Sequence, residues 1–288
     1  MPATPDPPDL SDPSDPSDHS DHTNHDAADT DTDTPAFPAT AAPRAADVPT
    51  LDSALSHCRA CPRLVAWREE AGRIKRKSFA DWDYWARPVA GFGPPDAALL
   101  LVGLAPAAHG GNRTGRMFTG DRSGDVLVAA LHDLGLANQA ESTAADDGLR
   151  LYGVRFTAPV HCAPPDNKPT PDERDTCRPW LVRELTLLRP TVRAIVVLGS
   201  FGWQALFPAL GAAGWQVPRP RPKFGHGVRV DIPATASGEP PLALFGSYHV
   251  SQQNTFTGRL TPAMLRDVLA TAARAAGLRP AAPEPGRR

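Results

Sequence analysis

Four cysteines are the residues of this chain whose types and spacing point most directly to chemistry. Cys58 and Cys61 form a C-x2-C pair, and Cys162 and Cys177 follow about 100 residues later with 14 residues between them. Thiolates at such spacing can converge on one metal site, and both zinc and a [4Fe-4S] cluster accept four of them. Four buried, reduced cysteines without a metal are the alternative. Since four protein ligands leave no open coordination position, a metal here is expected to be structural.

The first of three polar loops, GLAPAAHGGNRTGRMFTGD (103–121), is rich in glycine. Glycine lets backbone amides approach a ligand closely, and Arg113 and Arg116 could contact phosphate. Asp121 stands just before a helical pattern, so a helix N-cap is the alternative to a catalytic carboxylate. Phe118 could stack on a base or simply belong to the core.

The other two loops contain further candidate side chains. The loop TAPVHCAPPDNKPT (157–170) is stiffened by prolines and contains Asn167, which could position a water, read a base edge or only form a turn. The loop HVSQQNTFTGRLT (249–261) begins with His249. A histidine after a strand can donate a hydrogen bond to a developing oxyanion, although a structural histidine is the alternative.

Strand-length apolar runs precede these loops and alternate with helical patterns. The apolar runs lie at 97–104, 151–158, 193–199 and 242–250, and the helical patterns at 125–136, 171–188, 200–210 and 261–276. This alternation predicts an α/β fold, a three-layer α/β/α sandwich around a central, mainly parallel sheet of about four strands. Ligands bind beyond the carboxyl ends of such strands, where the polar loops lie. The Pro- and Gly-rich stretch 211–241 reads as an irregular insertion or hairpin without an assigned role.

Composition divides the chain into one domain with two tails. Residues 1–48 offer almost no apolar face and are predicted to be an acidic disordered tail, residues 49–279 one folded domain, and residues 280–288 a disordered C-terminal tail. The first 50 residues hold 11 Asp and one Arg, a net charge of −10 against −2 for the whole chain, so residues 51–288 carry +8. A basic body favours nucleic acid as a partner.

The cellular compartment expected from the sequence also affects how the cysteines are interpreted. No apolar run is long enough to span a membrane, and the N-terminus lacks the basic and apolar regions of a signal peptide. We therefore expect a cytoplasmic protein without a membrane partner. In a reducing compartment, cysteines are more often metal ligands or redox groups than disulfides.

These motifs together resemble the uracil-DNA glycosylase superfamily, and most closely its family 5, the type-b enzymes, over roughly residues 51–277. The resemblance rests on the loops 103–121 and 249–261 and on the order of the cysteines. It implies a monofunctional, monomeric hydrolase that flips uracil, and other modified bases such as hypoxanthine, out of DNA and removes them to begin base excision repair. It also implies that Cys58, Cys61, Cys162 and Cys177 hold a [4Fe-4S] cluster.

The resemblance assigns roles to the other candidates. Family 4 enzymes have an acidic residue early in the first motif, where this chain has 107–109 as Ala-Ala-His. It therefore points to Asp121 as the catalytic carboxylate, helped by Asn167 in positioning water, with His249 as the donor to the leaving base. We expect the base pocket to be lined by Gly103, Ala105, Phe118 and Asn254, and phosphates to be bound by Arg113, Arg116 and Arg259.

Substrate range and two rival functions complete the sequence-based expectations. Family 4 enzymes read uracil with an Asn at the position of Ala158, so the alanine here implies a broader substrate range. One rival is a non-catalytic DNA-binding protein with a structural zinc site, which would be colourless. The other is an electron-transfer iron-sulfur protein, disfavoured because no motif resembles a flavin or nicotinamide site.

Overall fold

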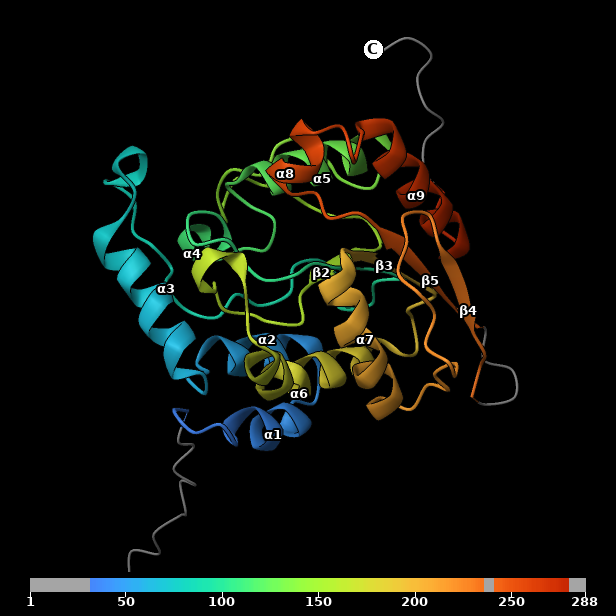
Figure 1. Cartoon of the computed structure of the whole chain (residues 1–288), viewed down its shortest axis with the longest axis horizontal. Helices are drawn as coiled ribbons and strands as arrows, with labels where there is room; N and C mark the ends of the chain where they lie inside the picture. Colours follow the sequence, from blue (N-terminus) through green and yellow to red (C-terminus); the bar gives the residue numbers. More distant parts are fainter. Residues whose placement is uncertain (1–31, 236–240, 280–288) are drawn as a thin grey trace, which may run out of the picture. The chain divides into compact units, whose positions relative to one another are not determined.

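A five-stranded sheet forms the centre of the chain in the computed structural model, which describes residues 32–235 and 241–279 (Figure 1). The sheet order is β2-β1-β3-β5-β4, in which β4 runs antiparallel to β5 and the other neighbours are parallel. The strands are β1 (Leu99–Val102), β2 (Val154–Thr157), β3 (Ala194–Leu198), β4 (Arg229–Ile232) and β5 (Leu242–Ser247). The four apolar runs of the sequence are the four parallel strands, which confirms the mainly parallel sheet.

Helices cover both faces of the sheet. Along β1, Leu99 and Leu101 belong to the core cluster on one face, whereas Leu100 and Val102 belong to the cluster on the other. In Figure 1 one pair of helices lies above the sheet and another pair below it. The upper pair is α5 (Arg122–Asp133) and α9 (Pro262–Ala275), and the lower pair is α6 (Pro171–Leu188) and α7 (Ser200–Ala212). Because both faces are buried, these strands read as continuous apolar runs, and the predicted three-layer sandwich is confirmed.

The edge strand β4 comes from the 211–241 stretch. Its residues Arg229 and Asp231 are exposed, and Ile232 is buried. Charged side chains on an edge strand discourage pairing with a further strand. The antiparallel pairing of β4 with β5 agrees with the hairpin alternative for 211–241, although no continuous apolar run marked the position of the strand.

The N-terminal segment corrects the predicted extent of the acidic tail. Residues 32–48, assigned to the tail, include α1 (Phe37–Ala41) and the 3-10 turn η1 (Ala42–Arg44), and α2 (Val48–Ser56) follows directly. The Phe37 ring packs 5.9 Å from that of Trp180 in α6, and Ala42, Ala45 and Val48 are buried. These few apolar residues are enough to fold the segment onto α6, so the predicted disorder is wrong for 32–48. The remaining predicted tails, 1–31 and 280–288, lie outside the described residues.

A buried ion-pair network ties α2 to the sheet. The Arg155 side chain of β2 donates through Nε to Glu184 of α6 at 2.6 Å and through Nη2 to Asp52 of α2 at 2.7 and 2.8 Å. The short elements that complete the fold are α3 (Pro62–Ile74), η2 (Lys77–Phe79), α4 (Gly111–Thr114), η3 (Pro165–Asn167) and α8 (Gln252–Phe256). In the ranges 32–235 and 241–279, no helix has the length and apolar character needed to cross a membrane.

Candidate active site

The carboxyl ends of β1, β3 and β5 meet at one edge of the sheet. Gly103 follows β1, Gly199 follows β3, and His249 lies just beyond β5. A Cβ added to Gly199 would come within 3.2 Å of the His249 Cβ, and one added to Gly103 within 2.7 Å of the Phe118 ring. Glycine at these positions therefore lets the two ring side chains lie against the strand ends, which is where sheets of this kind bind ligands.

Asp121 uses its two carboxylate oxygens differently. Oδ1 accepts hydrogen bonds from the backbone N–H of Ser123 at 2.9 Å and of Gly124 at 3.0 Å, which makes Asp121 the N-cap of α5. Oδ2 lies against Gly110, where an added Cβ would come within 2.0 Å of it, and it forms no hydrogen bond with the described residues. Burial raises the pKa of Asp121, although the two capping N–H groups oppose the shift. One oxygen thus fixes the carboxylate while the other stays available for chemistry.

Phe118 is held in an uncommon conformation at the strand end. Its backbone φ is +50°, which non-glycine residues rarely adopt. Its ring makes a T-shaped contact with Phe156 of β2 at 5.2 Å between centroids, and the side chain is only partly buried. The ring is therefore braced against the core beside Gly103 while part of it stays exposed.

His249 is a neutral imidazole at the same edge. Burial lowers the pKa of His249 to about 4, so the ring is uncharged near pH 7. Asn254, which follows in α8, donates from Nδ2 to the His249 carbonyl at 2.8 Å and so fixes the turn of the loop. Asn254 therefore has a structural role in this loop, and its role in binding the substrate stays a prediction.

Contacts between aromatic and basic side chains join the first and third loops. The Arg122 guanidinium at the start of α5 lies 5.8 Å from the centre of the Phe256 ring in α8. In Figure 1, α5 and α8 accordingly lie close together. Asp121 and His249 are therefore carried by loops that touch each other.

Asn167 lies on an exposed turn after β2. Asp166 and Asn167 both have positive backbone φ, +53° and +55°, and both are exposed. Consecutive left-handed residues other than glycine store strain, and such strain occurs at functional sites more often than elsewhere. Among the described residues, no hydrogen bond joins the Asn167 side chain to Asp121 or His249. The assistance of Asn167 to the carboxylate therefore stays a prediction.

Arg113, expected to bind a phosphate, is instead buried inside the protein. Its guanidinium lies between Phe79 and Trp82, 3.9 Å from the centre of each ring, and the residue is 3% exposed. Nε donates to the His109 carbonyl at 2.8 Å and Nη2 to the Gly120 carbonyl at 2.9 Å. The side chain therefore closes the first loop on itself and is unavailable to a phosphate in this conformation.

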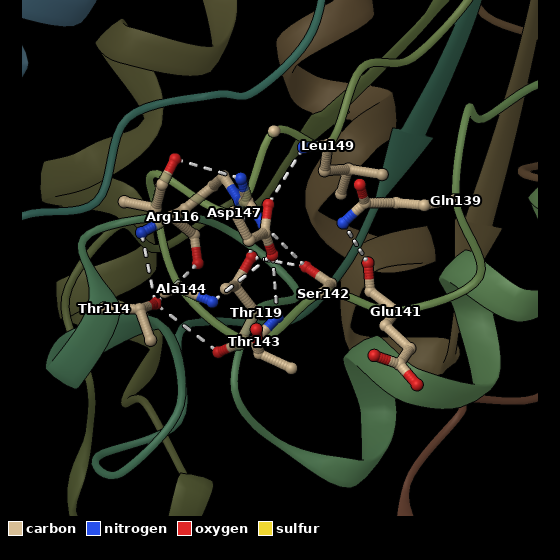
Figure 2. A network of polar contacts seen from close by, with 12 residues as sticks. Thr114, Arg116, Thr119, Gln139, Glu141, Ser142, Thr143, Ala144, Asp147 and Leu149 are labelled. Atoms are coloured by element: carbon tan, nitrogen blue, oxygen red, sulfur yellow. Dashed lines mark hydrogen bonds and ion pairs between the residues drawn. The ribbon is translucent and has the colours of Figure 1, made fainter.

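Arg116, also expected to bind a phosphate, instead forms hydrogen bonds within the protein (Figure 2). Its Nη2 donates to Asp147 at 2.6 Å and to Ser142 at 3.1 Å, and its Nε donates to Thr119 at 2.8 Å. Burial alone would raise the pKa of Asp147, but hydrogen bonds from Arg116 and from three backbone N–H groups lower it to about 2. Arg116 thus fastens the loop that carries Phe118 and Asp121 to the segment 142–149.

Two of the remaining predicted residues fit less simply. Arg259 is exposed, with its guanidinium 4.6 Å from the centre of the Tyr248 ring, so it remains available to a phosphate. Ala105 is partly buried and packs against the apolar group formed by Leu64, Val160 and Cys162. It therefore lies towards the cysteines.

The site also includes a residue that the sequence did not indicate. His226, from the 211–241 stretch, stacks on Tyr248 at 5.1 Å, and its Nδ1 accepts a hydrogen bond from the Tyr248 backbone N–H at 3.2 Å. The insertion therefore supports the residue directly before His249. Its irregular composition carried no signal of this, since the contact depends on the pairing of β4 with β5.

The four cysteines converge on one cavity. All four are free and line one cavity, together with Arg68, His161 and Trp180. Burial raises the pKa of Cys61 to about 12 and that of Cys162 to about 11, and neighbouring cysteines add to both shifts. Such thiols ionise near pH 7 only if a positive centre binds them. Among the described residues, no group of three or more His, Cys, Asp or Glu side chains is arranged closely enough to hold a metal ion as the side chains stand. The four cysteines are nevertheless the donor set on this cavity that suits a thiolate-bound metal centre.

Comparisons with known proteins identify the family. Residues 90–273 match the model of the "Uracil DNA glycosylase superfamily". The chain is also 56% identical over 228 residues to the type-5 uracil-DNA glycosylase of Mycobacterium bovis, over 79% of this chain and 81% of that protein. This chain belongs to the type-5 uracil-DNA glycosylases. The expected family is thereby confirmed.

Two other type-5 uracil-DNA glycosylases show how much of the chain the family covers. The Mycobacterium leprae protein is 54% identical over 234 residues, 81% of this chain and 98% of its own length. The Thermus thermophilus protein is 52% identical over 224 residues, 78% of this chain and 96% of its own length. The superfamily match spans the whole sheet, Asp121 and His249, and it begins after Cys58 and Cys61. Helix α3, which begins directly after Cys61, also lies outside the superfamily match.

Proposed function

We propose that this chain hydrolyses the N-glycosidic bond between uracil and deoxyribose in DNA, the step that begins base excision repair. The observation that carries the proposal is the pairing, in a type-5 uracil-DNA glycosylase, of Asp121 with one uncommitted oxygen and His249 with a neutral ring at the same sheet edge. This pairing favours an enzyme over a non-catalytic DNA-binding protein.

The roles of the residues follow from the charges that develop. As the bond between base and sugar lengthens, negative charge grows on the base and positive charge on the sugar. The neutral His249 donates a hydrogen bond to the base, and Phe118 stacks on it once it has flipped out of the duplex. Asp121 faces the sugar and accepts a proton from a water whose oxygen bonds to C1′. The base leaves with the electron pair of the broken bond and then takes up a proton.

Water positioning and base binding involve the remaining polar groups of the loops. Asn167, held in its strained turn, would orient the attacking water, and Asn254 and Gly103 would line the base pocket. No lysine belongs to these loops at the strand ends beyond Lys168, so we infer hydrolysis without a Schiff base or strand cleavage. Trapping of a covalent enzyme-DNA adduct by borohydride would contradict this.

The four cysteines, we infer, hold a [4Fe-4S] cluster rather than zinc. Four thiols around one cavity, three of them buried and that of Cys61 partly buried, suit such a cluster. The cluster would supply no step of the hydrolysis, which transfers no electrons, and would instead join α3 to the loop after β2. Iron and labile sulfide analysis of the purified protein tests this, since zinc without iron would contradict it.

The substrate range and surroundings are further parts of the proposal. Ala158, buried just after β2, has no amide with which to select uracil, consistent with acceptance of other modified bases such as hypoxanthine. Arg259 is the phosphate contact that the geometry leaves accessible, and Arg259→Ala should lower the salt dependence of DNA binding by about one counterion. We infer a cytoplasmic monomer, which sedimentation at working concentration would check.

The test of the function is base release. The wild-type protein is incubated with labelled duplexes containing a U·G, a hypoxanthine·T or an undamaged pair. We expect free uracil and an intact strand with an abasic site from the first duplex, and no product from the undamaged one. Absence of release from both damaged duplexes by iron-loaded protein would contradict the proposal.

A further inference from the structure

Arg68 is buried beside the cysteine cavity without a carboxylate partner. It belongs to α3 and is 1% exposed. Its Nη1 donates to the Cys58 carbonyl at 3.1 Å and to the Cys162 sulfur at 3.0 Å, while its Nε is buried and has no hydrogen-bond partner. In the described part of the chain it forms no ion pair. A buried guanidinium with an unused donor is costly unless an anion lies next to it.

Two other buried arginines show what Arg68 lacks. Arg155, 2% exposed, pairs with Glu184 and Asp52, and Arg116, 5% exposed, pairs with Asp147. Arg113, 3% exposed, has no ion pair among the described residues either, but its guanidinium lies between two aromatic rings. At Arg68 the side-chain partner is instead the Cys162 sulfur.

Trp180 presents a second unused donor on the same cavity. It belongs to α6, is 1% exposed, and its Nε1 is buried without a hydrogen-bond partner. The two unpartnered donors, from α3 and α6, thus lie on one cavity with the four thiols.

We propose that Arg68 is the counter-charge of the four-cysteine centre and that the Trp180 N–H is a further donor to its sulfurs. The inference rests on the proposed cluster, whose four thiolates outweigh the charge of its iron-sulfide core and leave it anionic. A guanidinium suits this role because it keeps its charge when buried and points several N–H groups at once. Positive charge and N–H donors beside a cluster stabilise the reduced form and so raise its reduction potential.

The test compares Arg68→Met, Arg68→Lys and Trp180→Phe with wild type in full-length protein purified without oxygen. Arg73→Met is the matched control, because Arg73 lies on the same helix but is exposed and pairs only with Glu70. The readouts are iron and sulfide per chain, the midpoint potential of the cluster, and the rate at which its visible absorbance bleaches in chelator.

For Arg68→Met we expect a more negative midpoint potential and bleaching about tenfold faster, which corresponds to roughly 1.4 kcal/mol. Trp180→Phe should shift both in the same direction by less, Arg68→Lys should be intermediate, and Arg73→Met should match wild type. Unchanged potential and bleaching in Arg68→Met would overturn the inference while leaving the cofactor in place. If Arg68→Met does not fold, Arg68→Lys and Trp180→Phe decide, and wild-type values in both would overturn it. Wild-type protein without iron would instead refute the cluster itself.

Discussion

The geometry of Asp121 is compatible with both of the roles that the sequence presents as alternatives. An aspartate before a helical pattern predicts an N-cap, and the glycine-rich loop around it indicates a catalytic carboxylate. The structure shows that Oδ1 takes the capping bonds and that Oδ2 lies over Gly110. The residue type was predictable, but the division between the two oxygens depends on a loop conformation that sequence patterns do not describe.

Arginine orientation is where residue-level prediction failed. Arg113, Arg116 and Arg259 all belong to polar loops, and their residue type suits phosphate binding equally well. Only Arg259 is exposed, because Arg113 lies between two rings that precede it by about 30 residues and Arg116 pairs with Asp147. Partners so distant in the sequence decide which guanidinium faces solvent.

Replacement of His249 should slow base release without removing a titration near neutral pH. Because burial lowers the pKa of His249 to about 4, the ring donates as a neutral group throughout the neutral range. We expect His249→Ala to reduce the single-turnover rate about 10²- to 10³-fold. The exposed His132, replaced in the same way, should leave the rate unchanged.

The pH–rate profile checks the same claim. As pH falls, activity should be lost as Asp121, whose pKa is raised, takes up a proton, and the charging of His249 should contribute only near pH 4. A wild-type profile with a step at the ordinary histidine pKa that vanishes in His249→Ala would contradict the neutral-donor role.

At the scale of elements, continuous apolar runs predicted the four parallel strands, which are covered by a layer of helices on each face. Apolar periodicity predicted the helices of those two layers. The range 171–188 is α6 itself, because Thr170 and Glu173 form a capping box that fixes its start. The edge strand β4 was anticipated only through the hairpin alternative for 211–241, and the N-terminal helix α1 was missed. Each buries only a few side chains, and their stability comes from β5 and α6 rather than from their own pattern.

The loop between α4 and α5 should depend on the pair Arg116–Asp147. Arg116→Met leaves the Asp147 carboxylate, 11% exposed, without its cation, so the free energy of unfolding in urea should fall by about 3 kcal/mol. Since the folded pKa of Asp147 is about 2, the contribution is complete above its ordinary range near 3.8 and is lost as the pH falls towards 2.

Two comparisons make this prediction specific. The exposed pair Arg73–Glu70 serves as control, and Arg73→Met should leave stability unchanged. A difference between wild type and Arg116→Met that persists unchanged from pH 7 down to pH 2 would show that the pair is not its source.

For the whole molecule, the N-terminal segment forms part of the wall around the cysteines. Phe37 packs on Trp180, and Trp180 lines the cysteine cavity. We expect Phe37→Ala to lower the free energy of unfolding by about 3 kcal/mol and to speed the loss of bound metal. Phe256→Ala, which removes a ring that is 71% exposed, is the control for stability. Equal stability of the two variants would refute the wall that we describe.

The central claim, that Asp121 supplies the catalytic carboxylate, is tested most directly by single-turnover uracil release from a U·G duplex by Asp121→Asn. Asparagine also caps helices well, so the α5 cap is kept while the proton acceptor is lost. Asp47→Asn, the same change at the N-cap of α2, is the matched control. We predict wild-type folding and metal content for both, a rate about 10²- to 10⁴-fold lower for Asp121→Asn, and an unchanged rate for Asp47→Asn. A fully active Asp121→Asn enzyme would contradict the account.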